Sequence, residues 1–194
     1  MALDLYYFIS TLPSLTFTGE GAPTVAEFRT RCHEALDPDD CQLLERLALC
    51  PPENLDRLAA RNETVCRWYG WQTAMRNAIA VFRARALKAD PKTHLRDEKD
   101  TDTPTGDLKR LAAVLEEKTA WKRQQGWEAL QWSKLEELEP AMRFCFDTLV
   151  VYALKLQLLE TRRRYALETG RAVFEEIIKA RLAEAAAHRV QTEG

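Results

Sequence analysis

Glycine and proline are scarce in this chain of 194 residues, which contains seven glycines and eight prolines. Both residue types interrupt helices and build tight turns. Alanine, leucine, glutamate and arginine dominate the sequence instead, and these residues are strong helix formers. The composition therefore favours an all-α fold.

Long hydrophobic runs are also missing from the sequence. The apolar run at 149–159 is about half as long as the ~20 residues that a membrane-spanning helix needs. At the N-terminus no basic segment precedes the apolar stretch and Asp4 stands before it, which is not typical of a secretory signal. We therefore expect a cytoplasmic protein with no membrane span of its own, peripheral to a membrane only as part of a complex.

The chain lacks a cysteine framework and an excess of positive charge. Its five cysteines are odd in number, form no Cys-x-x-Cys pair, and are predicted to be reduced thiols that are buried or half-buried. Lysine and arginine number 28 against 30 acidic residues, so the formal net charge is −2. This balance argues against a protein dominated by nucleic-acid binding. The Arg-Arg-Arg triplet at 162–164 is expected to spread around the surface of a helix, so it does not form one basic stripe.

No familiar catalytic motif is present. The sequence has no Gly-x-Ser-x-Gly elbow, no phosphate-binding Gly-Lys-Ser/Thr loop, no His-Glu-x-x-His pair and no dinucleotide glycine pattern. The acidic cluster Asp-Pro-Asp-Asp at 37–40 can hold magnesium or begin a helix, with Asp37 as the N-cap and Pro38 at the first helical position. We favour the helix start, and predict no catalytic residue, no metal and no cofactor.

Two long helical segments, 62–89 and 141–168, organise the rest of the chain. Each is apolar nearly all round, and helices of this kind belong at the centre of a bundle. Thr24 and Glu27 form a capping box that predicts a helix over 25–36. Helical spacing also covers 107–138, with a break expected at Gly126, whereas the short apolar run at 3–12 fits a helix or a strand. The prediction is a multi-helix bundle with two long buried helices.

A polar stretch at 90–106 separates the two halves of the sequence. It contains a single large apolar residue, Leu95, and cannot bury much surface. We expect residues 1–194 to form a single all-helical domain in which 90–106 is a flexible polar connection.

Isolated polar residues in the two long helices are the candidate functional positions. Arg76 and Asn77 interrupt an apolar helix and, together with Lys155, are expected to form a structural polar network, because buried polar groups need partners. Arg83 and Arg85 are expected to bind an acidic partner helix, although pairing with acidic residues of this same chain remains the simpler interpretation.

Three stretches of the sequence resemble an uncharacterised bacterial family whose members are encoded beside subunits of V/A-type ATPases. They are Tyr-Tyr-Phe-Ile-Ser-Thr-Leu-Pro-Ser-Leu at 6–15, Met-Arg-Asn-Ala-Ile with Arg-Ala-Arg at 75–85, and Tyr-Ala-Leu-Lys-Leu-Gln-Leu-Leu at 152–159. The pattern Arg-Asn-Ala-Ile-Ala-Val-Phe-Arg-Ala at 76–84 also resembles helices of the ATPase socket protein, the all-helical C (or d) component that joins the rotor ring to the central stalk. The chain is shorter than that protein, so it resembles only part of such a socket.

The resemblance implies a non-enzymatic accessory or socket-like component of the central stalk whose partners are V/A-type ATPase subunits. One alternative is a helical adaptor or scaffold unrelated to the ATPase. A second is a metal-dependent enzyme that uses Asp37, Asp39, Asp40 and the arginines on a phosphorylated substrate.

Overall fold

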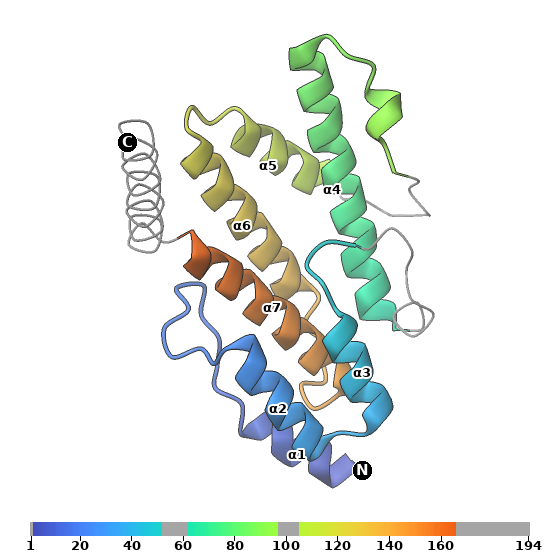
Figure 1. Cartoon of the computed structure of the whole chain (residues 1–194), viewed down its shortest axis with the longest axis vertical. Coiled ribbons are helices and arrows are strands. Elements are labelled where there is room, and N and C mark those ends of the chain that lie inside the picture. Colours follow the sequence, from blue (N-terminus) through green and yellow to red (C-terminus); the bar gives the residue numbers. More distant parts are fainter. Residues whose placement is uncertain (1, 52–61, 97–104, 166–194) are drawn as a thin grey trace, which may run out of the picture. The chain divides into compact units, whose positions relative to one another are not determined.

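A computed structural model describes residues 2–51, 62–96 and 105–165 of the chain. Over these ranges the protein is an all-α multi-helix bundle without a strand (Figure 1), which confirms the predicted fold class. The chain divides into two compact units, Met1–Leu158 and Leu159–Gly194. Most of the second unit lies outside the described residues, so the prediction of a single domain over 1–194 stays a prediction.

The described elements are all helices. They are α1 (Ala2–Ser10), α2 (Val25–Ala35), α3 (Pro38–Arg46), α4 (Glu63–Leu87), the 3₁₀ helix η2 (Pro91–His94), α5 (Thr105–Leu115), α6 (Ala120–Glu137) and α7 (Phe146–Arg164). The first apolar run, which fitted a helix or a strand, is thus the helix α1. None of the described helices is both long enough and apolar enough to cross a membrane.

Capping residues stand at several helix starts, and the capping box predicted at Thr24 is confirmed. The Thr24 side chain accepts a hydrogen bond from the Glu27 backbone N–H at 3.1 Å, and the Glu27 carboxylate accepts one from the Thr24 N–H at 2.7 Å. Asn62 caps α4 by accepting from the Val65 N–H at 2.8 Å. Asp37 is the N-cap of α3 with Pro38 in the first turn, but its side chain makes no capping hydrogen bond.

The expected break at Gly126 is wrong. Gly126 lies inside the continuous helix α6, and the interruption falls instead at 116–119, between α5 and α6. Thr119 begins α6 by accepting a hydrogen bond from the Lys122 N–H at 3.2 Å. The first backbone N–H groups of a helix have no partner within the helix, and a threonine side chain at the N-cap supplies one. Thr119 is therefore a favourable N-cap for α6.

The second long helix begins later than predicted, at Phe146 rather than near 141. Two side chains satisfy backbone carbonyls of the preceding bends, because Thr148 Oγ1 donates to the Arg143 carbonyl at 2.8 Å and Cys145 Sγ donates to the Met142 carbonyl at 3.1 Å. Such local bonds compete with helical ones. The predicted end near 168 lies outside the described residues.

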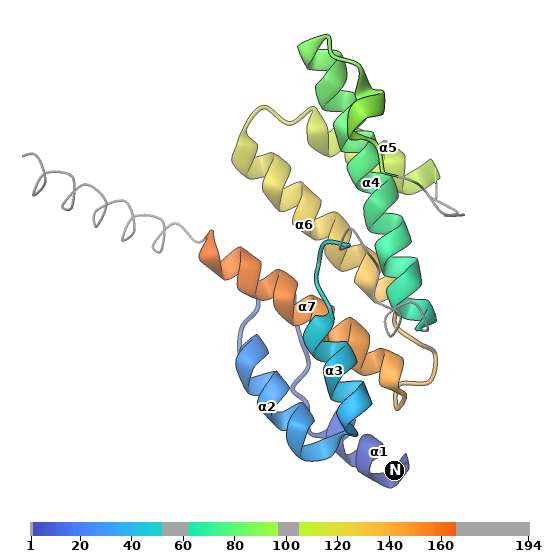
Figure 2. The same ribbon diagram turned by 45° about the vertical axis from the view of Figure 1, so that its right-hand side comes forward.

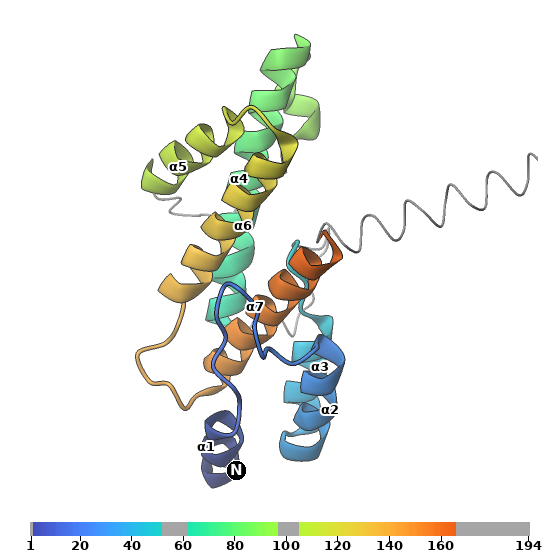
Figure 3. The same ribbon diagram turned by 90° about the vertical axis from the view of Figure 1, so that its left-hand side faces the viewer.

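The part of α7 within the first unit lies at its centre (Figures 2 and 3). Its Tyr152 hydroxyl donates to the Pro13 carbonyl at 3.1 Å, and its ring lies 5.2 Å from that of Phe28 in α2. Gln157 donates to the Leu47 carbonyl at the end of α3 at 2.9 Å, and Asp147 accepts from Asn62 at the start of α4 at 2.7 Å. Contacts on all sides explain why this helix is apolar nearly all round.

The other long helix, α4, is buried over only part of its length. Val65, Trp68 and Met75 are completely buried, whereas Phe82 is 42% exposed and Leu87 is 78% exposed in the last turns. The C-terminal end of α4 therefore presents apolar side chains to solvent.

The polar connection is partly ordered against α4. Residues 91–94 form η2, and the Asn77 side chain exchanges two hydrogen bonds of 2.9 Å with the backbone of Arg96. The Arg96 guanidinium also donates to the Pro51 carbonyl at 3.0 Å. Residues 97–104 of the expected flexible stretch lie outside the described residues.

Leu154→Ala should lower the free energy of unfolding by about 2–5 kcal/mol, because Leu154 is fully buried in α7 and its truncation leaves a cavity. Leu87→Ala removes the same atoms at an exposed site and should change stability by less than about 0.5 kcal/mol. Urea titration of both variants gives the comparison, and equal effects would contradict a central α7.

Candidate docking groove between α4, α5 and α6

An open groove of about 650 Å³ lies between α4, α5 and α6 within the first unit. Its walls combine apolar side chains with three arginines. The lining residues are Arg76, Ile79, Ala80, Phe82 and Arg83 of α4, Leu111, Val114 and Leu115 of α5, and Ala120, Arg123, Gln124 and Trp127 of α6. No aspartate or glutamate is among these described lining residues. The groove is therefore apolar and basic at once.

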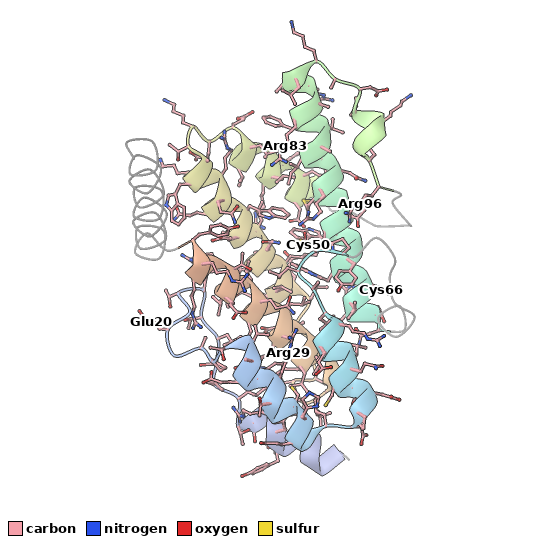
Figure 4. The ribbon with its side chains drawn as sticks, in the orientation of Figure 1. Glu20, Arg29, Cys50, Cys66, Arg83 and Arg96 are labelled. Carbon is pink, nitrogen blue, oxygen red and sulfur yellow. The ribbon has the colours of Figure 1, made fainter. Side chains whose placement is uncertain are left out.

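Helical spacing aligns the α4 wall. Arg76, Ile79, Ala80 and Arg83 recur at steps of three and four residues, which places them on one face of the helix. Figure 4 shows Arg83 extending from α4 toward α5, with Arg96 on the opposite side of α4. Because Asn77 anchors Arg96 on that opposite side, the groove face of α4 remains open.

The opposite wall is the helical hairpin formed by α5 and α6. Gly126 of α6 allows the two helices to approach closely, because a Cβ atom built there would lie 2.8 and 2.9 Å from the two methyl carbons of Val114. Real Cβ atoms do not tolerate such distances. The glycine that the sequence suggested as a helix break is instead a contact point between helices.

An aromatic stack with a buried hydrogen bond holds α4 to this hairpin. The Trp71 ring stacks on Trp68 at 5.5 Å and on Trp127 of α6 at 5.7 Å, with an interplanar angle of 1° to Trp127. The Trp71 indole N–H also donates to the buried carboxylate of Asp107 at 2.8 Å. Asp107 lies in the first turn of α5, where the helix dipole favours a negative charge.

The three groove arginines differ in how far they are already paired. Arg123 donates to the Glu117 carbonyl at 3.1 Å, and Arg76 donates through Nη2 to the Cys50 sulfur at 2.6 Å. Arg76 Nε is buried and has no hydrogen-bond partner within the described structure. Arg83 is exposed, and no ion pair or side-chain hydrogen bond engages it there. The groove thus carries guanidinium groups with unused hydrogen-bonding capacity.

The structure separates the two predicted partner-binding residues. Arg83 lines the groove, whereas Arg85 is exposed on α4 but is not part of the lining. Residues two positions apart in a helix point about 160° away from each other, so Arg85 extends from nearly the opposite side of α4. Arg83 is therefore the one of the two that lines the groove, and the binding of a partner by Arg83 and Arg85 stays a prediction.

The three residues of the predicted polar network, Arg76, Asn77 and Lys155, have different described partners. Arg76 faces the groove and Asn77 binds the backbone of Arg96. Lys155 of α7 is paired with Glu139 and lies 4.8 Å from the centre of the Trp132 ring, a cation–π contact. Buried polar groups need partners, and Asn77 and Lys155 have them, whereas Arg76 is paired through Nη2 and leaves Nε without one within the described structure.

Sequence reasoning missed Arg123 and Trp127 as site residues. They stand four residues apart, so they share a face of α6, and that spacing is a signal that the sequence contains. Which face of α6 meets α4 depends on tertiary packing and is not determined by α6 alone.

The acidic cluster is not part of the groove lining, and Cys50 touches the lining only through the hydrogen bond that its sulfur accepts from Arg76. Burial, and then the neighbouring charges of Asp37 and Asp39, raise the pKa of Asp40. Among the described residues, no three His, Cys, Asp or Glu side chains are grouped to hold a metal ion. Cys32 and Cys41 are buried as predicted, and burial raises the pKa of Cys32 to about 12, but Cys50 is exposed.

Comparison with known proteins identifies the family of this chain. Residues 55–184 match the family described as a protein of unknown function (DUF2764). Because the match covers more than half of the chain, the protein belongs to this family, and the matched stretch contains all three groove helices. No curated protein and no solved structure matches the chain.

Trp71 and Asp107 should be energetically coupled. In a double-mutant cycle with Trp71→Phe and Asp107→Ala, the hydrogen bond to a charged acceptor predicts a coupling free energy of about 1.5–3 kcal/mol. Chemical denaturation of the four proteins measures it. Effects that add within about 0.5 kcal/mol would show that the bond does not hold α4 to α5.

Gly126→Ala should destabilise the protein by about 1–3 kcal/mol, because the new methyl group meets the branched Val114 side chain. This sign opposes the gain of about 1 kcal/mol that alanine normally gives inside a helix. Gly106→Ala in α5 is the matched control, since nothing lies within 4 Å of the place that its new Cβ would occupy.

The overpacking should be relieved when Val114→Ala accompanies Gly126→Ala. Thermal unfolding of the double variant is expected to show a smaller loss than the sum of the single losses. Neutral or stabilising behaviour of Gly126→Ala alone would contradict the close approach of α5 and α6.

Proposed function

We propose that this protein is a non-enzymatic accessory component of a V/A-type ATPase, similar to part of the socket between rotor ring and central stalk. It is cytoplasmic and peripheral to the membrane through its partners. Its role is mechanical, since it holds a helix of an ATPase protein in the groove between α4, α5 and α6, and the proposal assigns it no catalytic residue and no cofactor.

One observation carries the proposal. The segment 76–84, whose pattern resembles helices of the ATPase socket protein, is the same segment that supplies five of the twelve groove-lining residues. Five of the nine residues behind the resemblance therefore also line the groove. The all-helical fold supports the same role, because the ATPase socket is all-helical too.

The chemistry of the groove is typical of a protein-binding surface. Tryptophan and arginine are enriched among the residues that dominate binding energy at protein interfaces. Here Trp127 and three arginines lie together, and Phe82 is 42% exposed at their side. A helical adaptor unrelated to the ATPase would use the same surface, so the two functions differ in which proteins bind.

Arg83→Glu should weaken capture of ATPase subunits by the tagged full-length chain. The new carboxylate would stand inside a surface that otherwise carries only positive charge, and like charges at an interface are costly. Affinity purification from cells that express the ATPase, with quantification of each captured subunit, measures the effect. We expect a loss of at least about tenfold.

Arg85→Glu is the matched control, because it makes the same charge change two residues away, outside the groove lining. It should leave capture unchanged, and both variants should unfold at the wild-type temperature, since exposed charge changes cost little stability. If the wild-type chain captures no ATPase subunit, the ATPase assignment is wrong. Capture of unrelated proteins through Arg83 would identify an adaptor.

A further inference from the structure

We infer that the occupant of the α4–α5–α6 groove is an acidic amphipathic helix of a partner protein. This inference rests on the docking role proposed above and adds the chemistry of the partner. It does not depend on the partner being an ATPase subunit.

The apolar part of the groove selects an amphipathic ligand. Ile79 and Phe82 from α4, Leu111 and Leu115 from α5, and Trp127 from α6 contribute apolar surface to one cleft. Among these side chains Phe82 is 42% exposed, so part of its ring is open to a ligand in the groove. An amphipathic helix fills such a cleft with residues at steps of three, four and seven.

The charge of the lining selects an acidic ligand. Three arginines contribute to the groove and no described carboxylate does, so a negative ligand meets complementary charge without a repulsive contact from the lining. Arg76 Nε is buried without a hydrogen-bond partner within the described structure, and Arg83 has no described partner either. A carboxylate is the acceptor that suits a guanidinium best, because the two groups form paired hydrogen bonds.

The spacing of the arginines favours a helix over a lipid headgroup. Arg76 and Arg83 are seven residues apart on one face of α4, which corresponds to about 10 Å along the helix axis. A single phosphate is too small to neutralise both positions. Two carboxylates seven residues apart on a partner helix repeat the same distance and can meet one arginine each. Arg123 then lies on the other wall of the groove.

Three synthetic peptides of about 18 residues, long enough to form several helical turns, provide the test. The first carries leucines at helical steps and glutamates seven residues apart beside them, with alanine and glutamine elsewhere. The second replaces every glutamate by lysine. The third has the composition of the first in a scrambled order that destroys the apolar face. Fluorescence anisotropy of labelled peptides measures binding to the full-length protein.

The acidic amphipathic peptide should bind at least about tenfold more tightly than the lysine peptide and the scrambled peptide. Arg83→Glu and Arg123→Glu should each remove this preference, and Phe82→Ala should weaken binding of the acidic peptide. Arg85→Glu should bind like wild type. Circular dichroism and thermal unfolding of each variant separate loss of binding from loss of fold.

Several results would overturn the inference. They are equal binding of the acidic and lysine peptides, binding that Arg83→Glu does not change, and no binding of the acidic peptide up to about 1 mM. Binding of the protein to phosphatidylglycerol vesicles is measured as well. Vesicle binding that requires Arg83, together with no peptide binding, would show that the groove binds a lipid surface instead.

The outcome is distinguishable from failure of the ATPase proposal. Peptide discrimination through Arg83, combined with no capture of ATPase subunits, keeps the acidic helix and rejects the ATPase. Capture of ATPase subunits that Arg83→Glu leaves intact, combined with no peptide discrimination, rejects the acidic helix in this groove and keeps the ATPase.

Discussion

The hydrogen bond from Trp71 to Asp107 is the contact on which the groove depends. Trp71 stacks between Trp68 of its own helix and Trp127 of α6, while its indole N–H donates to a carboxylate buried in the first turn of α5. One side chain thereby sets the position of α4 against both helices of the hairpin. The Asp107 carboxylate also lies 3.9 Å from the Lys134 ammonium group of α6, so this one carboxylate contacts both α4 and α6. The groove walls follow from this arrangement.

Local signals in the sequence are sufficient for much of the fold. The capping box of Thr24 and Glu27 depends on residues within three positions of each other, and it occurs as the sequence predicts. The central place of α7 follows from an apolar character that needs contacts on every side.

Gly126 is ambiguous because glycine has two different uses inside a helical pattern. It can end a helix, or it can let a second helix approach, and only the position of Val114 decides between them.

The candidate site is predictable only in part, since helical spacing fixes which residues of one helix share a face but not what that face meets. Arg83 is exposed and lines the groove, whereas Arg85 points elsewhere. Arg76 and Asn77 are neighbours in sequence, yet one faces the groove and the other binds Arg96 on another side of α4. The contribution of Arg123 arises from the packing of α5 and α6, which no local pattern encodes.

The groove face of α4 continues into the core as a row of polar groups. Trp68, Gln72 and Arg76 stand four residues apart, so they lie on one side of the helix. Each has a buried polar atom without a hydrogen-bond partner among the described residues, and Gln72 is fully buried. Such groups lower stability, and an apolar side chain at each position would cost less. Of the three, only Arg76 lines the groove, so this row joins the buried side of α4 to its groove face.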